Sequence, residues 1–359
     1  MTSRITGQVR IVGTGLLGAS IGQALVARGV DVILADASRA NLTLAIDYGA
    51  GRSAAIGDAP ELVIVSVPPD ATAAVVAAEL AAWPSATVTD VASVKSGIRR
   101  ELEAAGADLT RYIGSHPLAG RERGGAISAR ADLFIGRPWV ITTGDTARRR
   151  VIEDLVLDLG AVPVSMTAEE HDASVALVSH VPQVVSTLLA RRLGAAPEPA
   201  VALAGQGLRD TTRIASSDPE LWVQILGANA APVLDILRAY RDDLETVLAA
   251  LDAPDAPGAR RAIAEVLAGG NAGVARIPGK HGQANHFSQL VIMVDDKPGE
   301  LARLLTEIGE AGVNMEDLRL EHSPGAQIGL AEISVLPEAE ERLARELEAR
   351  GWKIAGGFA

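Results

Sequence analysis

Short apolar runs alternate with helix-length segments over the first half of the chain. The runs VRIVG, VDVILAD, LVIVSVP, ATVTDVA and PWVITT each suit a buried strand, and Ala- and Leu-rich stretches lie between most of them. This alternation, from Val9 to about Met166, indicates βαβ units around a largely parallel sheet. We therefore expect an α/β domain over residues 1–166.

The pattern changes to helical periodicity at Thr167. Thr167 and Glu170 have the spacing of a capping box, and a long amphipathic segment follows them. Further helical segments continue to about Leu267. We expect an all-α second domain over residues 167–268.

A glycine-rich stretch separates these helices from a third module. Residues 269–286, GGNAGVARIPGKHGQANH, are rich in glycine and polar residues and predict a linker. The segments that follow are SQLVIMV, ELARLLTEIGEAG, VNMEDLRLEH, QIGLAEISV, PEAEERLARELEAR and GWKIAG. They predict the order β, α, β, β, α, β, which is the ferredoxin-like order. We expect this α+β domain over residues 287–359.

Composition restricts the chemistry that this fold can carry. With 359 residues the chain is long enough for two or three domains. It contains no cysteine, which excludes disulfides, thiol nucleophiles and cysteine-ligated metals and fits a reducing cytosol. The formal charge of -12 provides no basic footprint for nucleic acid. The start MTSRITGQVR lacks an apolar signal core, and the runs LVIVSV and VIMV are too short to cross a membrane, so we expect a soluble cytoplasmic protein.

The segment VRIVGTGLLGASIGQAL carries a dinucleotide-binding fingerprint, GxGxxG, between an apolar strand and a helix. We expect Gly13 to make the tight turn, Gly15 to let the backbone approach a pyrophosphate, and Gly18 to allow close packing of helix and strand. The helix N-terminus then offers free N–H groups to the phosphates. A Rossmann-type sheet is thus expected in the first domain. The predicted cofactor contacts in this segment are Gly13, Thr14, Gly15, Leu16, Leu17 and Gly18.

Other positions bear on the identity of the cofactor. Asp36 ends the second predicted strand, where its carboxylate can accept hydrogen bonds from ribose hydroxyls, and this favours NAD over NADP. Arg39 is a contrary signal, because a nearby arginine can accept a 2'-phosphate. The alternative, an ordinary βα turn with a surface aspartate, fits the joint spacing less well. The third apolar strand ends in three further predicted cofactor contacts, Ser66, Val67 and Pro68.

Two polar loops are expected to border the nicotinamide. TDVASVKS leaves the carboxyl end of the fourth strand and GSHPLAG that of the fifth, and ligands bind at this edge of such sheets. His116 is then near a hydride acceptor, and Ser93 is available to hydrogen-bond one ring nitrogen and fix the tautomer of the other. Ser93 is also a predicted cofactor contact. The alternative is a histidine that only packs the loop. Lys95, in the same turn, is either solvated or stabilises the loop.

Several longer motifs resemble one enzyme family. GTGLLGAS, TDVASVKS, SHPLAGRERGGAISARADLFIGRPWVIT, HDASVALVSHVPQ and GLRDTTRIASSDPELW resemble, in the expected order, the prephenate and arogenate dehydrogenases of tyrosine biosynthesis. The C-terminal module, with VDDKPGELARLL at its first strand-to-helix turn, resembles an ACT regulatory domain. The resemblance implies NAD-dependent oxidative decarboxylation of prephenate to 4-hydroxyphenylpyruvate. A proton and a hydride leave the ring carbinol, and loss of carbon dioxide makes the ring aromatic.

The resemblance also implies roles for individual residues. His116 would accept the hydroxyl proton, with Ser93 orienting it. Arg213 would grip a substrate carboxylate with its planar guanidinium, although an arginine in a helical region is by itself more often a solvated charge. Glu122 and Arg209 match a charged pair that guards the site entrance in the family, or they are two unrelated solvated charges.

His180 lies on the apolar stripe of the helix predicted after Thr167, and by itself it is more consistent with a satisfied buried histidine. Pro182 removes one helix N–H and crowds the carbonyl of Val178, so a kink or an opened turn is expected here. That favours a pocket, and the family places a substrate-binding histidine in the matching SH motif. Trp222 either forms an apolar wall against the substrate ring or packs a core.

The ACT resemblance implies feedback by an amino acid, with tyrosine as the expected effector. We also expect the helical domain to form a homodimer. The predicted effector contacts are Asp296, Pro298, Gly299 and Asn314.

No metal site is predicted, because the histidines outside the proposed site show no ligand spacing with one another or with carboxylates. These histidines are His171, His281, His286 and His322.

Three alternative functions stay open at this point. An arogenate dehydrogenase would bind an ammonium where prephenate has a keto group, and Gln183 could face either side chain. A dinucleotide-binding regulator would sense an amino acid without chemistry, which the joint presence of His116, Ser93, His180 and Arg213 disfavours. A 3-hydroxyacid dehydrogenase is disfavoured by the HPLAG and RDTTRIA segments.

Overall fold

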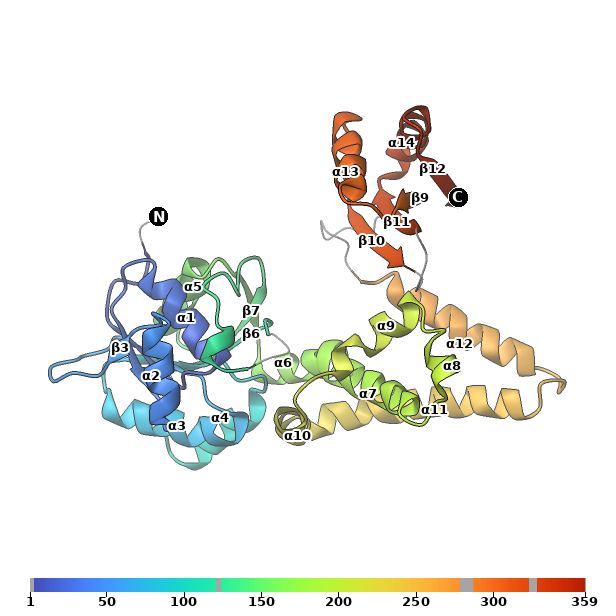
Figure 1. Ribbon diagram of the computed structural model, residues 1–359. Coiled ribbons are helices and arrows are strands. Elements are labelled where there is room, and N and C mark those ends of the chain that lie inside the picture. The colour runs from blue at the N-terminus through green and yellow to red at the C-terminus, as the bar shows by residue number, and fades with distance from the viewer. Residues whose placement is uncertain (1–2, 121–123, 278–286, 323–327, 359) are drawn as a thin grey trace. The chain divides into compact units, whose positions relative to one another are not determined.

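The chain folds into two compact units. A computed structural model describes residues 3–120, 124–277, 287–322 and 328–358 (Figure 1). The first unit contains Met1–Ala196 and Thr212–Tyr240, and the second contains Pro197–Thr211 and Arg241–Ala359. Three residues from the sequence analysis lie outside the described ranges. They are Glu122, predicted at the site entrance, and His281 and His286, which were assigned no metal.

An eight-stranded sheet forms the centre of the first unit (Figure 1). Its strands lie in the spatial order β3-β2-β1-β4-β5-β6-β7-β8, and the pair β6 and β7 is antiparallel while the others are parallel. The first six follow the Rossmann order, so the predicted, largely parallel sheet is confirmed. The strands are β1 (Val9–Val12), β2 (Val32–Ala35), β3 (Arg52–Ser53), β4 (Leu62–Val65), β5 (Thr87–Asp90), β6 (Tyr112–Pro117), β7 (Pro138–Thr142) and β8 (Val162–Met166).

Helices cover both faces of this sheet, and each face has its own hydrophobic cluster. One cluster joins α1, α2 and α5 to the sheet and includes Ile11 and Leu25, while the other joins α3 and α4 and includes Val63 and Leu80. Every residue of β4 and β5 is buried, which explains why the run of β4, LVIV, is continuously apolar. The helices are α1 (Leu16–Val26), α2 (Arg39–Asp47), α3 (Pro69–Ala82), α4 (Ser96–Ala104) and α5 (Thr146–Asp158), with the short 3-10 helices η1 (Leu109–Arg111) and η2 (Ala126–Ser128).

His116 differs in position from the sequence prediction, which placed it in a loop beyond the fifth strand. It lies within β6 and pairs with Val140 of the antiparallel strand β7. The last parallel pair between β5 and β6 joins Asp90 to Gly114. Beyond that pair, hydrogen bonding to β7 keeps the backbone extended, so the position of the His116 backbone is fixed by the sheet.

The helical stretch after the sheet begins at the predicted capping box and contains the predicted opened turn. The capping box at Thr167 and Glu170 is formed in both directions and starts α6 (Ala168–Val175). A π-helical turn, η3 (Ala176–His180), then joins α6 to α7 (Val181–Leu193). Pro182 lacks the N–H that would bond one turn back, so the wider turn at this point is physically reasonable.

The same stretch, Ala168–Leu193, is long and apolar enough to cross a membrane by length and composition. Its residues His171, Asp172 and His180 are buried and hydrogen-bonded within the first unit. This stretch therefore carries a buried polar cluster of the first unit.

More helices follow, and the last one enters the predicted linker. α12 continues to Val274, so residues 269–274 are helical and the linker prediction is wrong at its start. Each glycine in a helix costs about 1 kcal/mol relative to alanine, but extending an existing helix is far easier than starting one. The elements are α8 (Glu198–Val201), α9 (Gln206–Thr212), η4 (Arg213–Ala215), α10 (Pro219–Ala228), α11 (Ala230–Asp252) and α12 (Ala259–Val274).

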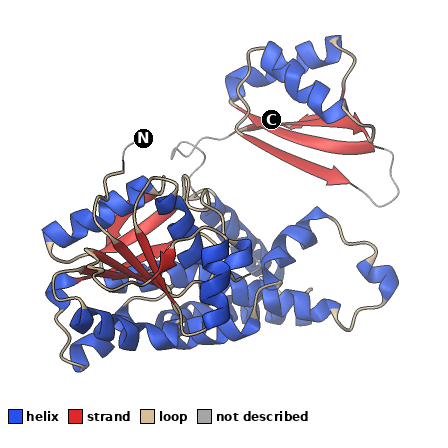
Figure 2. Ribbon diagram, turned by 60° about the vertical axis from the view of Figure 1, so that its left-hand side comes forward, coloured by secondary structure: helices blue, strands red, loops and turns tan. Residues whose placement is uncertain are grey.

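The C-terminal module, in the second unit, has the predicted order β, α, β, β, α, β. Its four strands are all antiparallel in the order β10-β11-β9-β12, and both helices cover one face of the sheet (Figure 2). A separate hydrophobic cluster, which includes Leu304 and Trp352, fills the space between the layers. The elements are β9 (Ser288–Asp295), α13 (Glu300–Glu310), β10 (Asp317–His322), β11 (Ile328–Val335), α14 (Pro337–Ala349) and β12 (Lys353–Phe358).

Candidate active site

The fingerprint glycines have the geometry that a dinucleotide motif requires. Gly13 has a φ of +96°, and a Cβ there would lie 2.2 Å from the carbonyl oxygen of Ser66. A Cβ on Gly18 would lie 2.0 Å from the carbonyl oxygen of Gly13, so α1 packs against the turn at a distance that only glycine allows. The Cβ position of Gly15 has no atom within 4 Å, which leaves space for a ligand to approach the backbone. The three predicted glycine roles are thus consistent with the fold.

The start of α1 is suited to an anion. Gly15 is its N-cap, and neither a capping side chain nor an acidic residue occupies the first turn. The unpaired N–H groups and the positive end of the helix dipole therefore remain available to a pyrophosphate. Val67 lies against Gly13, and Pro68 caps α3, so both belong to the loop at the switch point between β1 and β4.

Asp36 lies beside the fingerprint turn, as expected. Its Oδ2 accepts hydrogen bonds from the backbone N–H and the hydroxyl of Thr14, both at 2.7 Å, and its Oδ1 accepts from the Ser38 N–H at 2.7 Å. These bonds fix the Asp36 carboxylate at the end of β2, where the ribose of NAD would lie. The carboxylate oxygens can accept further hydrogen bonds, from the ribose hydroxyls. Arg39, the contrary signal, starts α2 and is exposed. The glycine turn, the uncapped start of α1 and the oriented carboxylate of Asp36 together fit the binding of NAD.

A chain of hydrogen bonds connects a carboxylate to His116. His116 Nδ1 lies 2.8 Å from His171 Nε2, and His171 Nδ1 lies 2.8 Å from Asp172 Oδ1. Asp172 also accepts the backbone N–H groups of Lys95 and Ser96, each at 2.8 Å, at the start of α4. Burial alone would raise the pKa of Asp172, but the bonds from His171 and these backbone groups outweigh it and lower the pKa. Asp172 is therefore ionised at neutral pH.

His116 is only partly buried, and its titration is shifted by its surroundings. Burial, then the His171 ring, the Lys95 ammonium and the His180 ring, lower the pKa of His116 well below its ordinary value of 6.5. His116 is therefore neutral at pH 7 and can accept a proton. The predicted hydrogen bond from Ser93 to His116 is not formed among the described residues. The capping box starts α6 at a point that brings His171 to the ring nitrogen instead.

A buried ion pair anchors the SVKS turn. The side chains of Lys95 and Asp90 are 1% and 0% exposed, and their charged groups are in contact. Asp90 Oδ2 also accepts the hydroxyl of Tyr112 at 2.6 Å, and Oδ1 accepts the Ala92 N–H at 2.9 Å. Burial lowers the pKa of Lys95, and the Asp90 carboxylate opposes that shift. Of the two alternatives from the sequence, Lys95 thus stabilises the loop and is not solvated.

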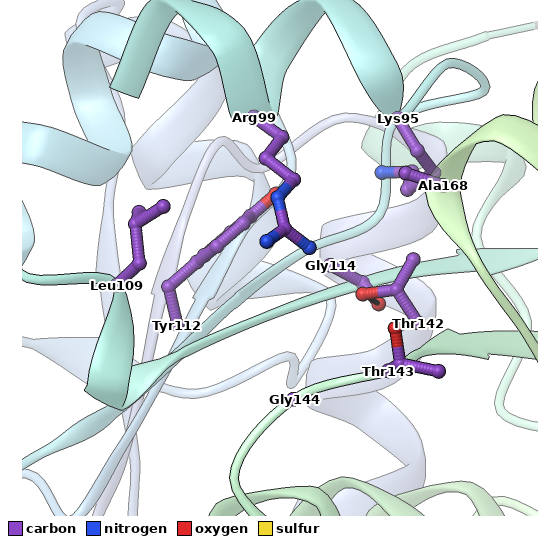
Figure 3. Close-up of a pocket in the computed structure, with 9 residues that line it drawn as sticks. All are labelled: Lys95, Arg99, Leu109, Tyr112, Gly114, Thr142, Thr143, Gly144 and Ala168. Atoms are coloured by element: carbon purple, nitrogen blue, oxygen red, sulfur yellow. Dashed lines mark hydrogen bonds between the residues drawn. The ribbon is translucent and has the colours of Figure 1, made fainter. Parts of the chain in front are cut away.

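A small cavity of about 70 Å³ borders the same ion pair (Figure 3). Two of its polar side chains are already engaged: the Thr142 hydroxyl donates to the Gly114 carbonyl at 3.0 Å, and Arg99 bonds Glu103 at 3.0 Å. None of the predicted site residues lines it, so it is not the candidate substrate site. The lining residues are Lys95, Arg99, Leu109, Tyr112, Gly114, Thr142, Thr143, Gly144 and Ala168.

His180 ends the π-helical turn and is held by an asparagine. The Asn229 Nδ2 lies 2.8 Å from the main-chain oxygen of Asp172 and 3.0 Å from His180 Nδ1. The half-buried Trp222 ring meets His180 edge-on, with the ring centroids 5.9 Å apart. Burial, followed by the His171 ring, lowers the pKa of His180 to about 4, although Asp172 acts in the opposite direction. His180 is therefore neutral at pH 7 as well.

The other predicted substrate contacts are less enclosed. Arg213 starts η4, is exposed and forms no ion pair with a described residue. Arg209 is exposed on α9, which belongs to the second unit apart from its last residue. Gln183 is buried on α7 and accepts a hydrogen bond from the Ser217 hydroxyl at 3.4 Å. His116, His180 and Trp222 thus join one cluster of hydrogen bonds and ring contacts, and the exposed Arg209 and Arg213 do not.

The predicted effector residues lie in two loops of the C-terminal module. Asp296, Pro298 and Gly299 connect β9 to α13, and Gly299 has a φ of +93° as the N-cap of α13. Asn314 follows α13, and its side-chain N–H donates to Glu316 at 2.8 Å.

Three residues of the site, His171, Asp172 and Asn229, were not predicted from the sequence. For His171 the sequence predicted only that it is not a metal ligand, and its bond to His116 was not predicted. The available signal was the His-Asp pair of HDASVALVSH, placed before His180 on a helix that proline disturbs. Nothing in the local sequence points to Asn229.

The chain matches two sequence models of one protein family. Residues 21–165 match "Prephenate dehydrogenase, nucleotide-binding domain", and residues 167–265 match "Prephenate dehydrogenase, dimerization domain". A protein of Streptomyces niveus described as "Probable prephenate dehydrogenase NovF" is 38% identical over 354 residues, which cover 95% of this chain and 98% of that protein.

Two solved structures are similar over most of the chain. The prephenate dehydrogenase of A. aeolicus, in complex with hydroxyphenyl propionate and NAD+, has a TM-score of 0.64 at 25% identity and covers 74% of this chain and 97% of its own. The arogenate dehydrogenase of Synechocystis has a TM-score of 0.61 at 26% identity, with coverage of 74% and 99%.

Proposed function

The chain belongs to the prephenate dehydrogenase family of NAD-dependent oxidoreductases, and we propose that it converts prephenate to 4-hydroxyphenylpyruvate by oxidative decarboxylation. The observation that carries this proposal is the bond from His116 to the buried pair His171 and Asp172. That arrangement holds a neutral imidazole in a fixed position near the carboxyl end of β6, in a sheet of the dinucleotide-binding type. A reaction that removes a hydroxyl proton beside a hydride acceptor needs such a base.

In the proposed reaction His116 takes the proton of the ring hydroxyl. NAD supplies the acceptor for the hydride that leaves the same carbon. As carbon dioxide departs, the electron pair of the bond to the ring carboxylate moves through the ring to the ketone oxygen, and the ring becomes aromatic. The proton held by His116 returns to that oxygen and gives the phenol. Arg213 grips a substrate carboxylate, neutral His180 hydrogen-bonds the substrate, and Trp222 forms an apolar wall.

The nearest alternative is arogenate as the substrate, because an arogenate dehydrogenase is among the similar structures. Arogenate carries an ammonium where prephenate carries a keto group, so a carboxylate partner would be expected in its site. The test is NADH formation with prephenate and arogenate side by side. Faster reduction of NAD with arogenate would assign the alternative, and no reduction with either would refute the proposed function.

We further propose that the C-terminal module is a ferredoxin-like ACT domain that binds an amino acid, with tyrosine as the effector. The order of elements and strands supports this proposal. A Cβ on Gly299 would have no atom within 4 Å, so its backbone is open to a ligand in the loop that also contains Asp296 and Pro298. Asn314, after the other end of α13, is the fourth proposed contact. Tyrosine added to the NADH assay is expected to inhibit the full chain. Unchanged rates, together with no heat of tyrosine binding, would refute it.

We propose a cytoplasmic homodimer, with a first domain over residues 1–166, a helical domain over 167–268 and the ACT domain over 287–359. One matched family model describes a dimerization domain. Leu244, Leu248 and Leu251 form an apolar stripe along α11 and are 46%, 44% and 59% exposed. A second copy of the chain is the proposed partner for this stripe.

Asp36 is expected to make the enzyme prefer NAD to NADP, because a 2'-phosphate would face a carboxylate fixed by Thr14 and Ser38. Asp36→Asn should narrow the ratio of kcat/KM values for NAD and NADP, because the repulsion is lost while Arg39 stays. Asp47→Asn, an exposed aspartate at the end of α2, should leave the ratio unchanged. Equal efficiency of the unsubstituted enzyme with both cofactors would contradict the assignment.

Arg213→Ala is expected to raise KM for prephenate with little change in KM for NAD. The lost charge-assisted contact to a carboxylate is worth roughly 1.5 to 3 kcal/mol, or about 10- to 150-fold. Arg192→Ala, which removes an exposed arginine near the end of α7, is the control and should change neither constant. A collapse of kcat at unaltered KM would instead assign Arg213 to the transition state.

A further inference from the structure

We propose that the hydrogen bonds around Asp172 hold the two site histidines in opposite tautomers, so that His116 accepts at Nε2 and His180 donates from Nε2. His171, Asp172 and Asn229 are then positioning residues. The inference rests on the proposed function for its catalytic meaning, because that reaction needs one base and one donor. The tautomers themselves are properties of the protein and can be measured without substrate.

The first step concerns the proton on His171. Asp172 is an ionised carboxylate that accepts two backbone N–H groups at the N-terminus of α4, and its Oδ1 lies 2.8 Å from His171 Nδ1. A carboxylate can only accept, so His171 Nδ1 must carry the proton. The opposite tautomer would bring two acceptors together in a site where His171 is 0% exposed, and no water could relieve the repulsion.

The second step transmits this choice to His116. A His171 ring that carries only this proton presents a lone pair at Nε2. His116 Nδ1 lies 2.8 Å from that lone pair, so it must donate, and the remaining lone pair of His116 is on Nε2. When Nε2 takes the substrate proton, the resulting imidazolium still donates to His171. The Asp172 carboxylate at the end of the chain then stabilises the new charge.

The third step fixes His180 in the other tautomer. The Asn229 side-chain nitrogen lies 2.8 Å from the main-chain oxygen of Asp172, which is an acceptor, so this atom is the NH₂ group and not the oxygen. Its second N–H points to His180 Nδ1 at 3.0 Å, and that nitrogen must accept. The proton of neutral His180 is therefore on Nε2. His180 can donate a hydrogen bond to a substrate oxygen, but it cannot act as a base through Nε2.

Nitrogen-15 NMR of the full chain tests the tautomers directly. Long-range proton–nitrogen spectra of the histidine-labelled protein at pH 7, assigned with His116→Asn and His180→Asn, distinguish the two ring forms. We expect the proton on Nδ1 in His116 and on Nε2 in His180. The opposite form in either ring would overturn the inference. This result is independent of turnover, so a protein that fails to oxidise prephenate would refute the proposed function without deciding the tautomers.

Variants of His171 test the positioning role. Gln can still offer an oxygen to His116 Nδ1, whereas Leu cannot, so kcat should fall roughly 10- to 1,000-fold in His171→Leu and clearly less in His171→Gln. These losses should stay below the ~10⁴-fold effect of a wrong tautomer in a Ser-His-Asp triad. Ser174→Ala, on the same helix with its hydroxyl bonded to Glu170, is the matched control and should retain full kcat. Undiminished kcat in folded His171→Leu, or equal loss in His171→Gln, would refute the role.

Asn229→Leu tests the proposed role of Asn229 in fixing the tautomer of His180. Leu has a similar shape but no N–H group, so it releases His180 Nδ1 and leaves the Asp172 carbonyl unpaired. We expect KM for prephenate to rise at least fivefold with a smaller change in kcat, and the His180 spectrum to show a mixture of tautomers. An unchanged KM together with a pure Nε2–H form would show that Asn229 does not set the tautomer.

Discussion

Replacing His116 with asparagine is expected to lower kcat for prephenate by roughly 10²- to 10⁴-fold, because the substitution removes the base while keeping a polar side chain of similar size. NAD binding should be retained, since the fingerprint turn lies between β1 and α1, and Asp36 directly follows β2. His180→Asn is the matched comparison. It should raise KM for prephenate more than it lowers kcat.

The pH dependence separates these roles further. Protonated His116 cannot accept the hydroxyl proton, so the rate of the unsubstituted enzyme should fall as the pH drops through the pKa of His116. Burial and the neighbouring His171, Lys95 and His180 hold that pKa well below 6.5, and the acid limb should therefore lie below pH 6.5. In His116→Asn, the pH profile of the residual rate should have no such acid limb. A limb that persists there would assign the base to another group.

Local sequence predicted those parts of the fold that local physics determines. The apolar runs became β1, β2, β4, β5 and β7, the capping box at Thr167 formed, and Pro182 opened the helix. The prediction of a linker was wrong for residues 269–274, because an established helix extends through glycines at a moderate cost in free energy. Strand β6 extended past the predicted loop because its antiparallel partner was not recognised.

The hydrogen-bonded cluster of the site could not be predicted in the same way. His116 and His171 are 55 positions apart in the sequence, and Asn229 is 49 positions from His180. Their bonds depend on how α6 and η3 pack against β6 and the start of α4, which no local pattern encodes. A motif can therefore identify His116 and His180 as chemistry-bearing, while the groups that set their protons emerge only from the fold.

Lys95 gives the clearest example of a residue whose role depends on packing. In the sequence it is one lysine in a polar turn, yet its ammonium is buried against Asp90. Lys95→Met is expected to lower the free energy of unfolding by about 3 to 5 kcal/mol, because it leaves a buried carboxylate without its counter-charge. At ~2–4 °C per kcal/mol for 150–250 residues, Tm should fall by roughly 6 to 20 °C.

Arg99→Met is the matched control for this prediction. Arg99 is also a cation on α4, but its pair with Glu103 is 46% and 50% exposed, and such i,i+4 pairs contribute about 0.3 to 0.5 kcal/mol. Calorimetric unfolding of the full chain should therefore separate the two variants clearly. The double variant Lys95→Met, Asp90→Asn should recover part of the loss, because the uncompensated charge is gone while the Tyr112 hydroxyl keeps an acceptor. If Lys95→Met unfolds at the temperature of Arg99→Met, the ion pair does not hold the SVKS turn, and the backbone N–H groups that orient Asp172 must be fixed by the rest of α4.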